Sequence, residues 1–175
     1  ESVIMSRTVD FRSDTVTKPT PAMRKAMAEA QVGDDVMGED PTANRLETMA
    51  AEMLGKEAGL FVSSGTMGNL VAILSHCRWG DEVIAGDRTH LYNAEAGGAS
   101  ALGGVSYHPL RNNERGMIDL VELEQAVRPA DGHYTPTRMI ALENTHNFYG
   151  GLVLTPDDIG SVSNIARSHE IPLHI

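Results

Sequence analysis

The chain has 175 residues and a mass of 18.8 kDa, and its 41% hydrophobic and 22% charged residues are typical of a globular chain with a core, which excludes disordered and fibrous classes. Aspartate and glutamate number 24 against 14 lysine and arginine, and this net charge of -10 argues against binding to nucleic acid or to an anionic membrane surface. The single cysteine, Cys77, excludes an internal disulfide, and no apolar run is long enough to span a bilayer.

The first residues of the chain are too few and too polar for a secretory signal peptide, so we treat residues 1–8 as an N-terminal extension. No repeat, low-complexity tract or long linker interrupts residues 9–175. We therefore expect one continuous body of structure in a cytoplasmic protein, with the mitochondrial matrix as the alternative location.

Two helices are expected in the N-terminal third. Thr20 is a typical N-cap with Pro21 at the first helical position, and a second helix is expected over 41–54, with Gly55 as its stop. Four methionines at helical spacing are most simply core residues: Met23, Met27, Met49 and Met53.

From residue 59 onward, short apolar strands alternate with amphipathic helices. The expected strands lie at 59–62, 82–85, 105–107, 139–142 and 172–175, and the expected helices lie at 66–76, 95–101, 119–127 and 156–169. This alternation predicts an α/β fold, with a mostly parallel sheet and flanking helices. Folds of this kind bind ligands at the carboxyl ends of their strands.

The sharpest local motif is Ser63-Ser64-Gly65-Thr66-Met67-Gly68-Asn69, which follows an expected strand and opens an expected helix. Backbone N–H groups and a threonine hydroxyl at such a junction form a phosphate cup. The alternative is an ordinary helix N-cap with glycines for a tight turn. The motif is neither a Walker A loop nor a dinucleotide-binding fingerprint.

Three histidines lie near the ends of expected strands: His90, His133 and His146. Each could act in proton transfer, and each could equally be a hydrogen-bonded loop residue. No metal site is expected, because Cys77 is solitary and no paired cysteine or histidine spacing occurs. We interpret Cys77 as a small buried hydrophobe and not as a nucleophile. Ser13, beside Arg12, could bind a carboxylate or merely cap a neighbouring turn.

Five blocks of residues, in order, resemble the L-threonine aldolases of the low-specificity or allo-threonine type. These enzymes are pyridoxal-phosphate lyases with the aspartate-aminotransferase-like fold (fold type I). The blocks are Asp10-Phe11-Arg12-Ser13-Asp14 with its continuation to residue 19, then 32–42, 64–69, 87–90 with 95–98, and Leu142-Glu143-Asn144-Thr145-His146-Asn147. The resemblance covers nearly the whole chain from residue 9, and it implies that residues 9–175 are the N-terminal part of the cofactor-binding large domain.

The resemblance implies pyridoxal 5'-phosphate as the cofactor and assigns residues to it. Ser64, Gly65 and Thr66 would hold the phosphate, in agreement with the cup expected from the motif itself. His90 would stack on the pyridine ring and lie near the substrate hydroxyl.

The same resemblance implies a small β-hydroxy amino acid as substrate and its retro-aldol cleavage, of L-threonine or L-allo-threonine, to glycine and acetaldehyde. Ser13 would bind the substrate carboxylate, and His133 would lie near the β-hydroxyl group. Glu95 and the block 143–146 would line or brace the pocket. His90 or His133 would then be the base that removes the hydroxyl proton. The family is typically homotetrameric.

Two family segments do not occur in this sequence: Asp-Gly-Ala-Arg, expected directly after the strand at 172–175, and the lysine that carries the cofactor. The only lysines, Lys18, Lys25 and Lys56, do not fit that position. We therefore expect the parent protein to be the enzyme and the 175-residue chain alone to be inactive. The alternative is a non-catalytic fragment that keeps the phosphate cup and an oligomer surface. A third, within the same cofactor class, is a related β-eliminating or aldol-cleaving lyase.

Overall fold

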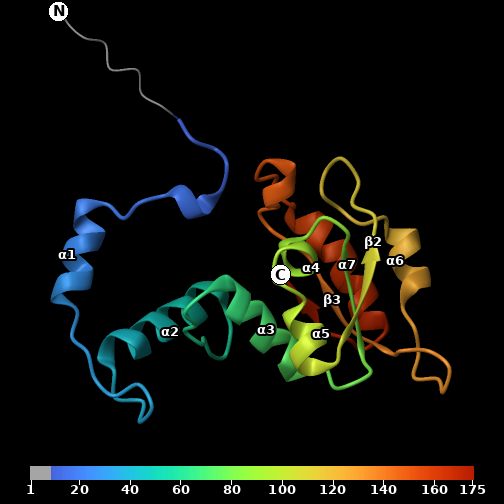
Figure 1. Ribbon diagram of the computed structural model, residues 1–175, viewed down its shortest axis with the longest axis horizontal. Helices are drawn as coiled ribbons and strands as arrows, with labels where there is room; N and C mark the ends of the chain where they lie inside the picture. The colour runs from blue at the N-terminus through green and yellow to red at the C-terminus, as the bar shows by residue number, and fades with distance from the viewer. Residues whose placement is uncertain (1–8) are drawn as a thin grey trace, which may run out of the picture. The chain divides into compact units, whose positions relative to one another are not determined.

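The computed structural model describes residues 9–175, so the extension predicted for residues 1–8 lies outside the described residues (Figure 1). The chain divides into two compact units, of which the first ends at Ser63 and the second spans Ser64–Ile175. The prediction that residues 9–175 form part of one large domain stays a prediction.

The first unit is built from short-range capping interactions. Its elements are η1 (Asp14–Val16), α1 (Pro21–Glu29) and α2 (Pro41–Leu54). Asp40 caps α2 because its carboxylate accepts the backbone N–H groups of Thr42 and Ala43 at 2.9 and 2.8 Å. Gly55 ends the helix in the left-handed region, with φ of 61°. The bounds predicted for this helix are thereby confirmed.

Burial in the first unit differs from the prediction. Ala51 is the one buried side chain among residues 9–63. The methionines predicted to be core are between 46% and 82% exposed, so that prediction is wrong for Met23, Met27, Met49 and Met53. An apolar stripe shows that a helix has a face to bury, but burial needs a second surface against that face.

The strand predicted at 59–62 is not formed. The backbone N–H of Phe61 donates instead to Oε1 of Glu47 on α2, at 2.7 Å. A Cβ built on Gly59 would stand 2.7 Å from the carbonyl oxygen of Glu47, so this segment lies directly against α2. A strand needs a hydrogen-bonding neighbour, and in the described part of the chain this segment has a helix beside it.

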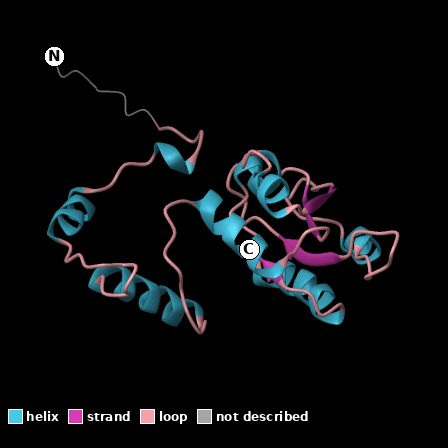
Figure 2. Ribbon diagram, turned by 60° about the horizontal axis from the view of Figure 1, so that its bottom comes forward, coloured by secondary structure: helices cyan, strands magenta, loops and turns pink. Residues whose placement is uncertain are grey.

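The second unit carries a four-stranded parallel sheet, which confirms the predicted α/β fold (Figure 2). The strands are β1 (Glu82–Gly86), β2 (Ser106–Leu110), β3 (Thr137–Ala141) and β4 (Leu173–His174), in the order β2-β1-β3-β4. Every residue of β1 is buried, as expected for a central strand with both faces covered.

Helices cover both faces of the sheet. They are α3 (Gly65–His76), α4 (His90–Asn93), α5 (Gly98–Gly103), α6 (Leu120–Ala126) and α7 (Pro156–Ser168), with η2 (Asn147–Tyr149) after β3. Ile84 belongs to a core cluster with α6 and α7, whereas Val83 and Ala85 belong to a second cluster with α3 and α5. Neighbouring residues of β1 therefore serve opposite cores, as the two-residue repeat of a strand requires.

Cys77 is the C-cap residue of α3 and is buried in the second of these clusters. Burial raises the pKa of its thiol to about 11, so the thiolate needed for nucleophilic attack is not populated near neutral pH. The interpretation of Cys77 as a buried hydrophobe is confirmed. Within residues 9–175, no helix has both the length and the apolarity to cross a bilayer.

Candidate functional site

A small cavity of about 170 Å³ opens at the carboxyl edge of the sheet. Three strands end there, because β1, β3 and β4 are parallel and their following residues emerge on the same side. The lining residues are Asn69, Thr89, His90, Leu91, Ala141, Leu142, Glu143, Asn144, His174 and Ile175. Among residues 9–175, no group of three or more histidine, cysteine, aspartate or glutamate side chains is placed to hold a metal ion.

The predicted phosphate cup is the N-terminus of α3. The Ser64 hydroxyl caps this helix by accepting the N–H of Met67 at 3.1 Å. Within the described residues, no protein atom accepts the N–H of Gly65 or Thr66, or pairs with the Thr66 hydroxyl. Apart from its chain neighbours and the backbone of its own helix, no heavy atom of the described residues lies within 4 Å of a Cβ built on Gly65, so a ligand could approach the backbone there. The free donors and the positive helix end fit a phosphate group.

His90 and Glu95 form the central pair of the site. The Nδ1 atom of His90, the first residue of α4, lies 2.9 Å from Oε1 of Glu95. The Glu95 side chain is 6% exposed and that of His90 is 47% exposed, so a buried acid holds an accessible imidazole. A carboxylate can only accept at Nδ1, so this contact leaves Nε2 of a neutral His90 as the proton acceptor.

Glu143 fixes the backbone around the same cavity. Its Oε2 accepts the backbone N–H of His90 at 2.5 Å, and its Oε1 accepts that of Asn147 at 2.8 Å. One carboxylate therefore ties the start of α4, after β1, to the turn that follows β3.

Asn69 and His174 also contribute to the cavity, although neither was a candidate from the sequence. The Asn69 amide donates to Oε1 of Glu95 at 2.7 Å, and its oxygen lies 2.8 Å from Nε2 of His174. His174 could have been found from the sequence, since it sits at the carboxyl end of an expected strand. Asn69 is the last residue of the motif that begins at Ser63, but the motif gave no reason to assign it a role of its own.

His146 is next to Glu143 but is not one of the residues that line the cavity. Its ring is fully buried, and within the described residues neither ring nitrogen has a hydrogen-bond partner. Its Nδ1 is 3.6 Å from Oε1 of Glu143, and its ring packs edge-on against Tyr149 at 4.9 Å. Burial lowers the pKa of His146, against the smaller opposing effect of Glu143.

His133 is not brought together with His90. It lies on the loop before β3, next to the amino edge of the sheet, while His90 follows the carboxyl end of β1. Its side chain is 90% exposed and its Nδ1 pairs with Asp131 at 3.1 Å. The assignment of His133 to the substrate hydroxyl stays a prediction.

Ser13 belongs to the first unit, where it caps η1. Its hydroxyl accepts the N–H of Thr15 at 3.3 Å and donates to Asp14 at 3.1 Å. Arg12 pairs with Asp10, with 2.6 Å between Nη2 and Oδ2. The local geometry matches the cap alternative, and binding of a substrate carboxylate by Ser13 stays a prediction.

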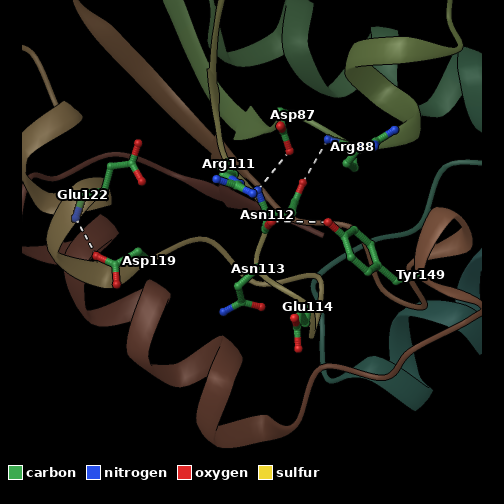
Figure 3. A pocket seen from close by; sticks show the side chains of 9 residues that line it. All are labelled: Asp87, Arg88, Arg111, Asn112, Asn113, Glu114, Asp119, Glu122 and Tyr149. Carbon is green, nitrogen blue, oxygen red and sulfur yellow. Dashed lines mark hydrogen bonds between the residues drawn. The ribbon is translucent and has the colours of Figure 1, made fainter.

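A larger cavity, of about 620 Å³, lies beyond β1 and β2 but is a weaker candidate (Figure 3). Its centre is Asn112. The side-chain amide of Asn112 accepts the backbone N–H of Arg88 and donates to the carbonyl of Gly116. The backbone of Asn112 donates its N–H to Asp87 and accepts the hydroxyl of Tyr149 at its carbonyl. A Cβ at Gly86 would stand within 2.3 Å of the Asn112 amide oxygen. These polar groups are committed to holding loops together, so we place the functional site at the smaller cavity.

Comparisons with known proteins identify relatives of this chain. A family model described as beta-eliminating lyase matches residues 10–175. The chain is 51% identical over 175 residues to low-specificity L-threonine aldolase 1 of Arabidopsis thaliana, covering 98% of this chain and 49% of that protein. It is 44% identical over 167 residues to the low specificity L-threonine aldolase of Escherichia coli K12, covering 95% and 49%.

Among solved structures, a threonine aldolase from Leishmania major superimposes with a TM-score of 0.74 and 24% identity, over 93% of this chain and 48% of that chain. This match shows a shared fold. The chain spans about half the length of the curated relatives that it matches.

Proposed function

The chain belongs to the beta-eliminating lyase family, and on that premise we propose that its parent protein cleaves L-threonine and L-allo-threonine to glycine and acetaldehyde with pyridoxal 5'-phosphate as cofactor. The observation that carries this proposal is the His90–Glu95 pair, which presents a proton acceptor in the cavity at the carboxyl edge of the sheet. The names and 44–51% identity of the curated relatives support the choice of substrate.

The residues of the second unit fit the cofactor. The free N–H groups of Gly65 and Thr66, with the Ser64 and Thr66 side chains beside them, would hold its phosphate. When bound, pyridoxal phosphate withdraws electrons from the α-carbon of the amino acid. The protein must then bind and orient the substrate and accept a proton.

His90 is the base that we favour. Its free Nε2 would take the proton of the β-hydroxyl group as the bond between the α- and β-carbons breaks and the carbonyl of acetaldehyde forms. Glu95, bonded to Nδ1, would stabilise the imidazolium that results. His133 remains the second candidate for this proton, on the resemblance alone.

The proposed assembly follows from the resemblance, and the exclusion of nucleic acid and membranes as partners follows from the net charge. We propose a homotetramer in the cytoplasm, with the mitochondrial matrix as the alternative, acting on small amino acids and on neither nucleic acid nor membranes. Size-exclusion chromatography with light scattering of the full-length protein would test the tetramer.

The products formed from L-threonine test the proposed reaction. Full-length protein supplied with pyridoxal phosphate should release equal amounts of glycine and acetaldehyde. A β-eliminating lyase would instead convert the same substrate to 2-oxobutanoate and ammonia, which would overturn the aldol proposal and support the related lyase.

The 175-residue chain, assayed in parallel, should be inactive. The sequence has three lysines, Lys18, Lys25 and Lys56, and none of them matches the position of the lysine that carries the cofactor in the family it resembles. An intact mass near 18.8 kDa for the purified protein, together with cofactor binding but no release of product, would support the alternative of a non-catalytic fragment.

A further inference from the structure

We propose that Asn69 and His174 are positioning residues for the reaction: with Glu95 they form a hydrogen-bonded chain that holds His90 with its Nδ1 bonded and its Nε2 free. This inference rests on the proposed function only in taking His90 as the base. The hydrogen-bonded chain itself exists in the protein without substrate or cofactor.

Four side chains from separate parts of the second unit make up this chain. His174 ends β4, Asn69 lies on α3, Glu95 follows α4, and His90 begins α4. The three contacts measure 2.8 Å from His174 Nε2 to Asn69 Oδ1, 2.7 Å from Asn69 Nδ2 to Glu95 Oε1, and 2.9 Å from Glu95 Oε1 to His90 Nδ1. All three are within the range of good hydrogen bonds.

The chemistry of the groups gives the chain one direction. An ionised Glu95 has no hydrogen to donate, so the amide of Asn69 must turn its NH₂ toward Glu95. The Asn69 oxygen then faces His174, which must donate from Nε2. Burial, with a smaller contribution from His76, lowers the pKa of His174 and favours its neutral form, in which Nε2–H is the tautomer that this contact selects.

The same order of donors and acceptors determines the tautomer of His90 at the other end of the hydrogen-bonded chain. Oε1 of Glu95 accepts from Asn69 and from His90 at once, so His90 must carry its hydrogen on Nδ1. Free neutral imidazole has no such constraint, and either nitrogen can carry the hydrogen. The chain therefore selects the tautomer that can accept a proton from the substrate.

Asn69 also connects this chain to the phosphate cup. Asn69 and Gly65 are four residues apart on α3, so they lie on the same face of that helix, about 6 Å apart along its axis. One helix thus places both the phosphate donors and the residue that orients Glu95. Since Asn69, His90 and His174 all line the cavity, a bound ligand would exclude water from the chain and strengthen its bonds.

The alternative to be excluded is a purely structural role, in which Asn69 only connects β4 to α3. The tautomer of His90 separates the two roles, because a tether does not select which nitrogen carries the hydrogen. Nitrogen-15 NMR of histidine-labelled, full-length, cofactor-free protein reports this directly, and the His90→Gln variant identifies the His90 signals.

We expect wild-type His90 to show the Nδ1–H form alone. Asn69→Leu, of similar size but unable to hydrogen bond, should give a mixture with the Nε2–H form. His174→Leu should shift the mixture less, and His174→Gln, which can still donate to Asn69, should restore the wild-type signal. The matched control is Asn93→Ala, which removes an amide that supports α4 through the carbonyls of Asp87 and Thr89 without touching the chain, and which should leave the tautomer unchanged.

Kinetics provide the second readout. Asn69→Leu should lower kcat about tenfold, the lower end of what loss of an orienting partner costs, with KM changed less than about twofold. An Asn69→Leu protein that keeps the Nδ1–H form and wild-type kcat would overturn the inference. Should that variant fail to fold, the contrast between His174→Leu and His174→Gln decides by the same criteria. A wild-type protein with no activity on threonine would contradict the proposed function. The NMR result would still test whether the hydrogen-bonded chain selects the tautomer of His90.

Discussion

The two edges of the sheet both hold buried acids, but the partners of those acids differ. At the amino edge, Glu82 is 4% exposed and contacts the Arg128 guanidinium at 3.2 Å and the Thr137 hydroxyl at 3.0 Å, with His108 also at 3.2 Å. At the carboxyl edge, Glu95 meets an imidazole and an amide.

This difference predicts that the acid at the amino edge contributes to stability, whereas the acid at the carboxyl edge contributes to the reaction. Arginine keeps its charge at any pH at which the protein folds, so the amino edge is a permanent ion pair. His108 also contacts Glu82, but the Arg128 charge beside that acid is permanent. At the carboxyl edge, Glu95 is bonded to the imidazole of His90, which is half exposed in the cavity and can accept a proton from a ligand through Nε2. Substitutions at the two edges should therefore affect different measurements.

The largest effect should come from His90→Ala at the carboxyl edge. Loss of the base should lower kcat by about 100- to 1,000-fold, with little change in the yield of folded protein, because the side chain is half exposed. Steady-state release of acetaldehyde from L-threonine measures it. His133→Ala, near the amino edge, should cost less than about tenfold, and an equal loss in both variants would break the comparison.

Glu95 should give the next largest effect. Glu95→Ala leaves Nδ1 of His90 without its acceptor and should lower kcat about 100-fold, whereas Glu95→Gln keeps an oxygen for Nδ1 but no charge and should cost about tenfold. Comparing the two kcat values separates the orientation of His90 from the stabilisation of its charge. Equal losses in both variants would assign the whole effect to charge.

Glu82→Gln should affect folding instead of turnover. It removes the charge facing Arg128 and should lower the free energy of unfolding by about 1–3 kcal/mol, the usual cost of an impaired buried hydrogen bond to a charged group. Denaturant titration measures the loss, and kcat of the folded protein should stay within about twofold of wild type. A large fall in kcat would show that the two edges are not independent.

The smallest effect should be a dependence of stability on pH through His146. Its folded pKa lies below the unfolded value of 6.5, so the unfolded chain takes up the proton first as the pH falls. Stability is therefore complete above about pH 6.5 and decreases toward the folded pKa. Denaturant titrations of wild type and His146→Leu at pH 7.5, 6.5 and 5.5 should show a weaker pH dependence in the variant.

Much of the fold could be predicted because the determining signals are local. The bounds of α2 follow from Asp40, Pro41 and Gly55, which act within one turn of the helix. The segment 59–62 fails for the opposite reason, since forming a strand depends on a neighbour that the sequence does not identify.

The site divides in the same way. Ser64 and Thr66 could be proposed from the sequence because the predicted phosphate cup is a contiguous motif, and its role stays a prediction. His90 and His133 each lie near a strand end, but a loop before a strand and a loop after one face opposite edges, and that distinction needs the assembled sheet. Asn69 acts through partners 26 and 105 residues away, a relationship that no local pattern contains.

The contact between Gly86 and Asn112 limits which substitutions can accumulate at these two positions during evolution. Any side chain at position 86 would collide with the amide that joins the loops after β1 and β2, and a shorter residue at position 112 would release those loops. Neither position can change first without loss, so inherited variation at the two should appear as a linked pair. In an alignment large enough to detect covariation, positions 86 and 112 should either be substituted together or both stay unchanged.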